Sequence, residues 1–537
     1  MRNKINKFLM SCIIILIGFS NVGYAQIFNE DMYKFGKALH FIDNQYIDSV
    51  DRAELVEEAL KKIVDDLDPH TVYLTKEEVQ EMNESLEGNF EGIGIEFNIH
   101  NDTIYVISPI SGGPSEKVGI QAGDRIVKIN DENVAGIGIS TNGVRDRLLG
   151  EKGSKVNVTI KRPGVDRLLE FTIVRDKIPI HSLDAAYLTN NRHGYVKLNR
   201  FAQTTHEEFT EAVEQLREKG AQSLILDLRG NGGGYLDQAI KLADEFLAKD
   251  KLIVYTEGRN VERENNHATQ EGMFENENIV ILIDEGSASA SEIVSGAVQD
   301  WDRGIIIGRR SFGKGLVQRP VSLPDGSMIR LTIARYHTPT GRAIQKPYDD
   351  DKKEYAKELL NRYNRGEMIS ADSINFPDSL QYRTKNTDRI VYGGGGIMPD
   401  IFMPLDTTRY SELFNDFVRQ GILNAFVIDY IDQNRNKFKD NYPTFNEFKN
   451  DFNVDGDIMD ELISFAEDEG IEIDGERKDE LKESKNDLKL HIKALIARDM
   501  WDMSEYFQIV NKEDMIFQKA NEILNNWDQY ESEYLQP

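Results

Sequence analysis

The sequence predicts an α+β protein of several domains, in which a small β-rich domain precedes an α/β core and helical regions flank both. Apolar residues recur at helical spacing in residues 26–85 and again in residues 405–537. Short apolar runs separated by glycines fill residues 86–176, as expected of a small β-domain. Buried-strand patterns alternate with helical patterns through residues 177–404, which is typical of an α/β core.

Residues 1–25 have the pattern of a secretory signal peptide. Arg2, Lys4 and Lys7 precede the apolar run Phe8–Phe19, and Gly23-Tyr24-Ala25 offers a small-x-small cleavage site. We therefore expect an exported protein of the periplasm or cell envelope, with an uncleaved membrane anchor as the alternative. The single cysteine, Cys12, lies in this segment, so the mature chain would have neither a disulfide nor a thiol nucleophile.

The overall charge excludes some classes of partner. The chain has 92 acidic and 64 basic residues, a net charge of −28, which argues against nucleic acid and anionic membranes. Its nine histidines are scattered, and none forms an H-E-x-x-H motif. We therefore expect no metal and no cofactor.

The N-terminal helical region ends at a proline. Leu55, Ala59, Leu60, Ile63 and Leu67 recur at helical spacing before Asp68-Pro69-His70, where Pro69 stops the helix. His70 could suggest a catalytic base, but a structural histidine in a turn is the favoured interpretation.

A glycine loop opens the β-rich region. In Gly92-Ile93-Gly94-Ile95, successive backbone N–H groups could bind the terminal carboxylate of a peptide, which would then add as a strand to the sheet edge. A glycine pair in an ordinary hairpin is the alternative. The string Ala122-Gly123-Asp124-Arg125-Ile126 follows at the spacing found in PDZ domains, which residues 86–176 therefore resemble. A helix at Arg145–Leu149 would flank the bound peptide.

The core begins with two buried strands, Tyr195–Leu198 and Leu224–Leu228, separated by an amphipathic helix near His206–Lys219. A glycine-rich loop, Arg229–Tyr235, follows the second strand. It is a weak signal for phosphate binding, because Tyr235 breaks the G-x-G-x-x-G pattern. A plain turn before a helix at Leu236–Phe246 is the other interpretation.

The residues that suggest catalysis lie in the segment 286–318. The strand Ile279–Ile283 leads into a Ser/Ala-rich turn and a helical pattern, and a glycine-flanked lysine, Lys314, follows a further apolar run. The start of a helix can stabilise an oxyanion, and a desolvated lysine can act as a base. The pattern therefore suggests a serine nucleophile activated by lysine. Spacing alone does not choose among the four serines, Ser287, Ser289, Ser291 and Ser295.

Two other motifs overlap this segment. Ser311 and Lys314 form an S-x-x-K string, but Gly313 and Gly315 disfavour the helix that this motif needs. Gly308 to Lys314 satisfies G-x-x-x-x-G-K, yet Gly315 stands where a phosphate loop has a hydroxyl, and the following residues have a strand pattern.

The segment resembles the carboxyl-terminal processing (tail-specific) proteases, peptidase family S41. Their S-A-S-A-S-E motif matches residues 287–292, and F-G-K-G-x-V-Q matches residues 312–318. The resemblance implies a crotonase-like core in which Ser289 is the nucleophile, Lys314 the base and Gln318 the residue that orients the lysine. It also implies an oxyanion hole formed by the backbone of Ala290 and of Gly232 or Gly233.

The remaining segments carry less information. Val317–Leu323 and Met328–Tyr336 are expected strands joined by a turn, and residues 347–386 form a charged insertion. From residue 405 onward the chain is acidic and helical, with a charge run at Asp474–Lys489 that predicts a solvated helix or a linker. Trp501, Phe507, Phe517 and Trp527 are expected in a core, and the family resemblance does not extend to this region.

Taken with the resemblance, the sequence predicts an exported serine endopeptidase that recognises protein C-termini through its PDZ domain. Its expected partners are proteins with unstructured C-termini, with an adaptor protein and further copies of the chain as candidates. Because a lysine base must be neutral, activity should rise toward alkaline pH. An inert PDZ-type binding module and a Ser–Lys hydrolase acting on a non-peptide substrate are the competing hypotheses.

Overall fold

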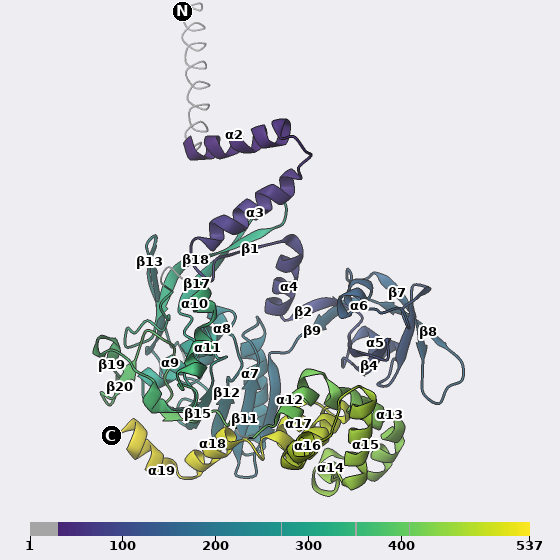
Figure 1. Ribbon diagram of the computed structural model, residues 1–537. Helices are drawn as coiled ribbons and strands as arrows, with labels where there is room; N and C mark the ends of the chain where they lie inside the picture. The colour runs from purple at the N-terminus through teal and green to yellow at the C-terminus, as the bar shows by residue number, and fades with distance from the viewer. Residues whose placement is uncertain (1–29, 270, 349–351, 408, 537) are drawn as a thin grey trace, which may run out of the picture. The chain divides into compact units, whose positions relative to one another are not determined.

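The computed structural model describes residues 30–269, 271–348, 352–407 and 409–536. The predicted signal peptide, with Cys12, lies outside these residues. The chain divides into two compact units, residues 1–73 and 74–537. The α+β organisation predicted from the sequence is confirmed, with a small β-rich domain ahead of an α/β core and helices toward both ends (Figure 1).

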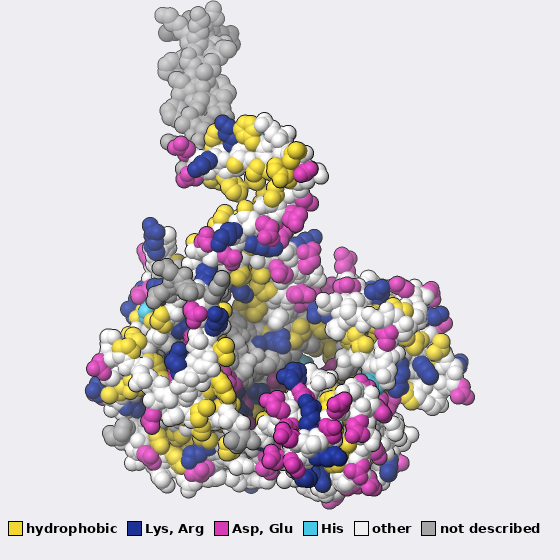
Figure 2. Space-filling model, viewed as in Figure 1, with side chains coloured by type: hydrophobic (Ala, Val, Ile, Leu, Met, Phe, Trp, Pro, Cys, Tyr) yellow, Lys and Arg dark blue, Asp and Glu magenta, His cyan; other side chains and the backbone are white. Residues whose placement is uncertain are grey.

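The described part of the first unit contains two helices, α2 (Glu30–Gln45) and α3 (Arg52–Asp65). Asp51 caps α3 by accepting hydrogen bonds from the backbone of Ala53 and Glu54. None of the residues of α2 is buried, and hydrophobic side chains gather on its surface (Figure 2). His70 lies in the turn after α3, where the carboxylate of Asp68 accepts its backbone N–H.

The second unit begins with α4 (Lys76–Glu87), and the small β-rich domain follows. Its main sheet has the strand order β3–β4–β5–β7–β8, with β6 paired to β5, so β3 lies at an edge. A separate antiparallel pair, β2 and β9, joins the segments where the chain enters and leaves this domain. The strands and helices are β2 (Asn89–Gly92), β3 (Ile95–His100), β4 (Thr103–Pro109), α5 (Pro114–Val118), β5 (Arg125–Ile129), β6 (Glu132–Asn133), α6 (Thr141–Leu148), β7 (Lys155–Lys161), β8 (Leu169–Val174) and β9 (Asp176–Pro179).

The α/β core is built on a six-stranded sheet with the order β10–β11–β12–β15–β16–β21. Strand β10 is antiparallel to β11, and the other neighbouring strands are parallel. The strands are β10 (Leu183–Leu188), β11 (His193–Leu198), β12 (Ser223–Asp227), β15 (Asn278–Ile283), β16 (Ile305–Gly308) and β21 (Ile401–Phe402). The carboxyl ends of the parallel strands lie at one edge of the sheet, which is where sites form in such folds.

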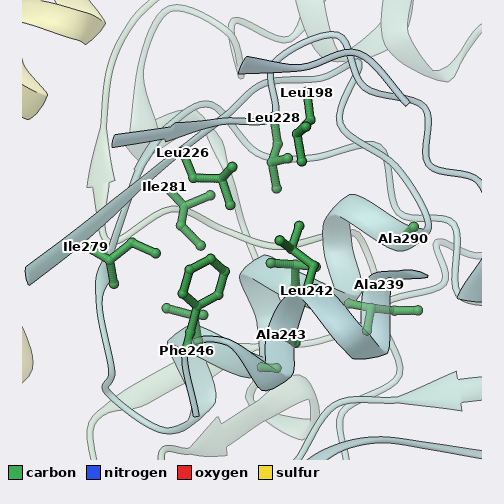
Figure 3. Close-up of a cluster of buried hydrophobic side chains, with 14 of the residues drawn as sticks. Leu198, Leu226, Leu228, Ala239, Leu242, Ala243, Phe246, Ile279, Ile281 and Ala290 are labelled. Atoms are coloured by element: carbon green, nitrogen blue, oxygen red, sulfur yellow. The ribbon is translucent and has the colours of Figure 1, made fainter. Parts of the chain in front are cut away.

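Both faces of this sheet are covered. On one face, α7 (Thr205–Glu218), α8 (Leu236–Asp244) and α9 (Ala290–Asp300) contribute apolar side chains to a continuous core with the strands. Figure 3 shows this packing, with Leu242 and Phe246 close to Leu226 and Ile281. On the other face, α18 (Met515–Asn525) packs against β12, β15 and β16. The sheet is thus buried on both sides, as parallel sheets require.

A second, antiparallel sheet lies beside the core. It contains β13 (Leu252–Gly258), β14 (Val261–His267), β17 (Leu316–Ser322) and β18 (Met328–His337), and β18 pairs with both β13 and β17. The charged insertion that follows forms short elements rather than a layer of its own: α10 (Lys352–Ala356), α11 (Glu358–Asn364), the 3₁₀ turns Ala371–Ser373 and Asp378–Leu380, and the hairpin β19 (Gln381–Arg383) and β20 (Ile390–Tyr392).

The C-terminal region is helical, as predicted. Helices α12–α17 share an apolar core of their own, to which the predicted core residue Trp501 packs. The charge run lies in the first half of α16, which is not fully solvated, because Ser484 and Leu488 are buried. The helices are α12 (Glu412–Arg419), α13 (Ile422–Asn441), α14 (Phe445–Asp451), α15 (Gly456–Asp468), α16 (Arg477–Met500), α17 (Met503–Val510), and, after α18, α19 (Trp527–Tyr530) with a final π-helical turn, Glu531–Leu535.

Candidate active site

The turn between β15 and α9 places Ser289 in an unusual conformation. Ser289 has φ 55° and ψ −110°, a region that residues with a side chain rarely adopt and that is typical of functional sites. It immediately precedes Ala290, the first residue of α9. The N–H groups of Ser291 and Glu292 donate to the carbonyls of Ala288 and Ser289, whereas that of Ala290 has no acceptor among the described residues. The Glu292 carboxylate accepts the Ser289 N–H and so closes a capping box.

The structure distinguishes Ser289 from the other three serines of the motif. Ser287, Ser291 and Ser295 are fully buried, and each donates its hydroxyl to a backbone carbonyl: that of Leu228, Asn231 and Ser291, respectively. Ser289 is partly exposed. The hydroxyls of Ser287 and Ser291 therefore tie the turn to the loop after β12, and that of Ser295 bonds within α9, whereas Ser289 is accessible.

Lys314 lies in the loop between β16 and β17. Its Nζ donates to Oε1 of Gln318 at 3.0 Å, so two of the residues predicted to act together are in contact. The flanking glycines allow this loop to pack closely. A Cβ on Gly313 would lie 3.0 Å from the backbone of Gly396, and one on Gly315 would lie 2.8 Å from that of Gln345. The loop is not helical and leads into a strand, which agrees with neither the S-x-x-K nor the phosphate-loop motif.

Glu292 joins the nucleophile turn to the lysine loop. Its Oε2 accepts the backbone N–H of Ser289 at 2.8 Å and that of Lys314 at 2.9 Å. Its Oε1 accepts the Gly313 N–H and the Ser311 hydroxyl. Burial raises the pKa of Glu292, while these four donors favour its ionised form. Glu292 belongs to the S-A-S-A-S-E motif, but the sequence alone did not indicate this bridging role.

Tyr336 makes a second connection between the same two segments. The hydroxyl of this β18 residue contacts the carbonyl oxygens of both Ser289, at 3.1 Å, and Lys314. Burial raises the pKa of Tyr336 well above its ordinary value, so the hydroxyl stays a donor at alkaline pH. Sequence reasoning missed this residue, because nothing in its strand pattern marks it as polar and functional.

The glycine-rich loop after β12 lies against the nucleophile. A Cβ on Gly233 would come within 2.8 Å of the Ser289 Cβ and 2.9 Å of the Ala290 nitrogen, so only glycine fits there. The Gly233 N–H donates to Oδ1 of Asn231 at 2.9 Å and is therefore occupied. Gly232 is exposed with open space beside its Cα, and its N–H has no hydrogen-bond acceptor among the described residues.

The charged insertion contacts the lysine loop. Arg362 of α11 donates to the carbonyl of Ser311 at 2.8 Å, and Arg310 forms an ion pair with Glu367. Ser311 itself is fully buried and donates to Glu292, so it is a structural residue of the loop. The insertion therefore buttresses the segment that carries Lys314, which sequence reasoning did not predict.

The glycine loop of the β-rich domain leads into the edge strand β3. Gly94 has φ 73°, and its carbonyl accepts the N–H of Ile110, while the Ile93 carbonyl accepts that of Ser115. Gly92 ends β2, and Ile95 begins β3. Because β3 has a neighbour on one side only, its free edge offers the backbone groups that strand addition uses.

The described residues contain no cluster of three or more His, Cys, Asp or Glu side chains arranged to hold a metal ion. None of the helices in the described part of the chain is long and apolar enough to cross a membrane.

Four segments of the chain match known families. Residues 192–351 match peptidase family S41, residues 92–173 match the PDZ domain, and residues 20–78 match the N-terminal domain of the activating protease CtpB. Residues 413–502 match a family of unknown function.

Curated relatives agree with these matches. The chain is 36% identical over 318 residues to the carboxy-terminal processing protease CtpB of Bacillus subtilis, covering 59% of this chain and 66%, just under two thirds, of that protein. It is 37% identical over 343 residues to a carboxy-terminal-processing protease of Bartonella bacilliformis, covering 63% of this chain and 78% of the relative. A solved photosystem II D1 C-terminal processing protease is 29% identical with a TM-score of 0.34, covering 59% of this chain and 91% of the other.

Proposed function

Because the chain belongs to the carboxy-terminal processing proteases of peptidase family S41, a family of serine peptidases, we propose that it is an exported endopeptidase that cleaves proteins after recognising their C-termini. The observation that carries this proposal is the strained, partly exposed Ser289 at the start of α9, tied through Glu292 to the backbone of Lys314.

In the proposed reaction, Ser289 Oγ attacks the scissile carbonyl, and neutral Lys314 accepts the hydroxyl proton. Lys314 then protonates the leaving amine, and water hydrolyses the acyl-enzyme. Gln318 orients the lysine by accepting a hydrogen bond from its Nζ. Since only the neutral amine accepts a proton, activity should rise from neutral toward alkaline pH.

The oxyanion that forms on the substrate would be stabilised by two backbone N–H groups. The N–H of Ala290, at the first position of α9, has no acceptor within the helix and lies beside the nucleophile. Of the two glycines that sequence reasoning left open, Gly232 is the better donor, because the Gly233 N–H already bonds to Asn231. Gly233 instead provides the close approach that brings the loop to Ser289.

Recognition of the substrate tail is assigned to the PDZ domain. Its loop Gly92-Ile93-Gly94-Ile95 would bind the terminal carboxylate, and the tail would pair with the edge strand β3. An unstructured C-terminus fits this mode, because strand addition needs an extended peptide. Export rests on the signal pattern of residues 1–25. An adaptor protein and self-association remain proposals as well.

The test is cleavage of an unstructured protein that ends in a free apolar C-terminus, compared with the same protein bearing an amidated tail. We expect the free-tail substrate to be cleaved at least about tenfold faster at low concentration, because amidation removes the charge that the loop binds. Equal rates would contradict tail recognition. Failure to cleave either substrate would favour the inert PDZ-type binding module. Release of a non-peptide acyl group, without cleavage of either protein, would favour a Ser–Lys hydrolase that acts on a non-peptide substrate.

A further inference from the structure

Arg229 begins the glycine-rich loop, and its side chain turns back onto the last residue of β12. Its Nη2 lies 2.6 Å from Oδ2 of Asp227, and its Nε lies 3.0 Å from Oδ1. The hydroxyl of Tyr195 donates to Oδ2 of the same carboxylate at 2.8 Å. Asp227 is fully buried, and the side chain of Arg229 is only 16% exposed. This pair leaves Nη1 of Arg229 directed away from Asp227.

That remaining nitrogen is bound by a residue of the C-terminal region. Nη1 of Arg229 donates to Oδ2 of Asp514 at 2.7 Å, across 285 residues of sequence. The other oxygen of Asp514 caps α18, accepting the N–H groups of Ile516 and Phe517 at 2.9 Å each. Both carboxylate oxygens are thus used, one for the helix and one for the arginine.

Asp514 is held in place because α18 is packed into the catalytic sheet. Phe517, Ala520 and Ile523 belong to one buried cluster with sheet residues of β11, β12, β15 and β16. The ring of Phe517 meets that of Tyr195 edge to face, with centroids 5.3 Å apart. Because this packing fixes α18, an aspartate at the start of the helix can fix the position of the arginine that it binds.

The backbone carbonyl of Arg229 is held by a second contact, from the side chain of Lys197. Nζ of Lys197 donates to the Arg229 carbonyl at 3.0 Å, and this ammonium lies 5.5 Å from the ring centroid of Phe507 in α17. The C-terminal helices therefore contribute to holding Arg229 at both its side chain and its carbonyl. Two residues later, Asn231 accepts the N–H of Ala288 and the hydroxyl of Ser291, which links the loop to the nucleophile turn.

We propose that Asp514 is a positioning residue of the peptidase. By fixing Arg229 it fixes the loop that carries the Gly232 N–H, the donor assigned above to the oxyanion, so this inference rests on the proposed function. Asp514 lies outside the four matched segments, the last of which ends at residue 502. Helix α18 is accordingly part of the catalytic domain rather than an appendage to it.

The test uses Asp514→Asn, which keeps a side-chain oxygen to cap α18 but removes the charge that binds Arg229. Asp455→Asn is the matched control, because Asp455 caps α15 through its bond to the Ile458 N–H. Aspartate and asparagine cap helices about equally well, so neither change should affect folding through the cap. We expect kcat of Asp514→Asn to fall about tenfold with KM nearly unchanged, and Asp455→Asn to match the wild type.

Hydrogen exchange of the peptide spanning residues 229–234 gives a second measurement that does not need activity. We expect faster exchange of this loop in Asp514→Asn than in the wild type or in Asp455→Asn, and partial restoration of kcat and protection in Asp514→Glu. Unchanged loop exchange, or an unchanged kcat in an active enzyme, would overturn the inference. If the wild type itself cleaves nothing, the proposed function fails, while loop exchange still reports whether Asp514 holds Arg229.

Discussion

The backbone N–H groups of Ser289 and Lys314 donate to the same atom, Oε2 of Glu292, at 2.8 and 2.9 Å. The two segments that carry the proposed nucleophile and base are thereby joined through a single buried carboxylate. A carboxylate suits this position because it accepts from four donors without needing to donate.

Glu292→Gln should damage both stability and catalysis. The glutamine amide replaces one acceptor oxygen by an NH₂ group that faces two donors. We expect the free energy of unfolding to fall by about 3 kcal/mol and kcat to fall about 100-fold. Denaturant unfolding and steady-state kinetics would measure these effects. Glu214→Gln, an exposed change on α7, is the control, and a Glu292→Gln enzyme with wild-type kcat would contradict this role.

Tyr336→Phe tests the second connection. Removing the hydroxyl leaves the carbonyls of Ser289 and Lys314 without this donor, which should cost about 1–3 kcal/mol of stability. Activity should fall by a similar factor across the pH range, because the raised pKa of Tyr336 keeps it neutral throughout. A loss that appeared only at high pH would instead point to titration of this hydroxyl.

Gly233→Ala should abolish activity by a steric clash. The new Cβ would meet the Ala288 carbonyl, the Ser289 Cβ and the Ala290 nitrogen at 2.8–2.9 Å, in a backbone with φ 96°. Gly230→Ala is a matched comparison, since Gly230 has φ 71° but open space around its Cα. We expect Gly230→Ala to lower the free energy of unfolding by only roughly 1–2 kcal/mol, which is the cost of placing alanine in the left-handed conformation. Equal kinetic effects of the two substitutions would contradict close packing at Gly233.

The lowered pKa of Asp227 predicts a specific loss of folding stability in acid. Burial opposes its ionisation, but the Arg229 guanidinium and the Lys197 ammonium outweigh burial and hold the pKa of Asp227 well below its usual range. The folded state therefore favours the carboxylate, and this stabilisation is present above the unfolded pKa of about 3.9 and is lost as pH falls toward the lower folded value. The gap in unfolding free energy between wild type and Asp227→Asn should narrow between pH 6 and pH 3. A constant gap would contradict the assignment.

Local patterns predicted much of the fold. The strands Ile279–Ile283 and Leu224–Leu228 and the helix after Ser289 were predicted because apolar runs and turn residues mark them in sequence. The roles of Ser289, Lys314 and Gln318 came from family resemblance and stay predictions. Their spacing alone could not separate Ser289 from Ser287, whose buried hydroxyl bonds become visible only in three dimensions.

Contacts between distant segments could not be predicted. Tyr336 reaches Ser289 across 47 residues, and Asp514 reaches Arg229 across 285. No local pattern encodes such pairs, because sheet order and the packing of α18 decide them. The choice between Gly232 and Gly233 likewise depended on one side-chain bond, from the Gly233 N–H to Asn231.

The most direct test compares the rates at which wild type, Ser289→Ala, Ser295→Ala and Lys314→Ala cleave the free-tail substrate. Ser295 lies further along α9 and is fully buried, and its hydroxyl donates to the Ser291 carbonyl, so it is a matched serine without access to substrate. We expect wild type and Ser295→Ala to cleave the substrate, and the rate to fall by at least about 1,000-fold in Ser289→Ala and Lys314→Ala. Cleavage that survived Ser289→Ala would contradict the central assignment.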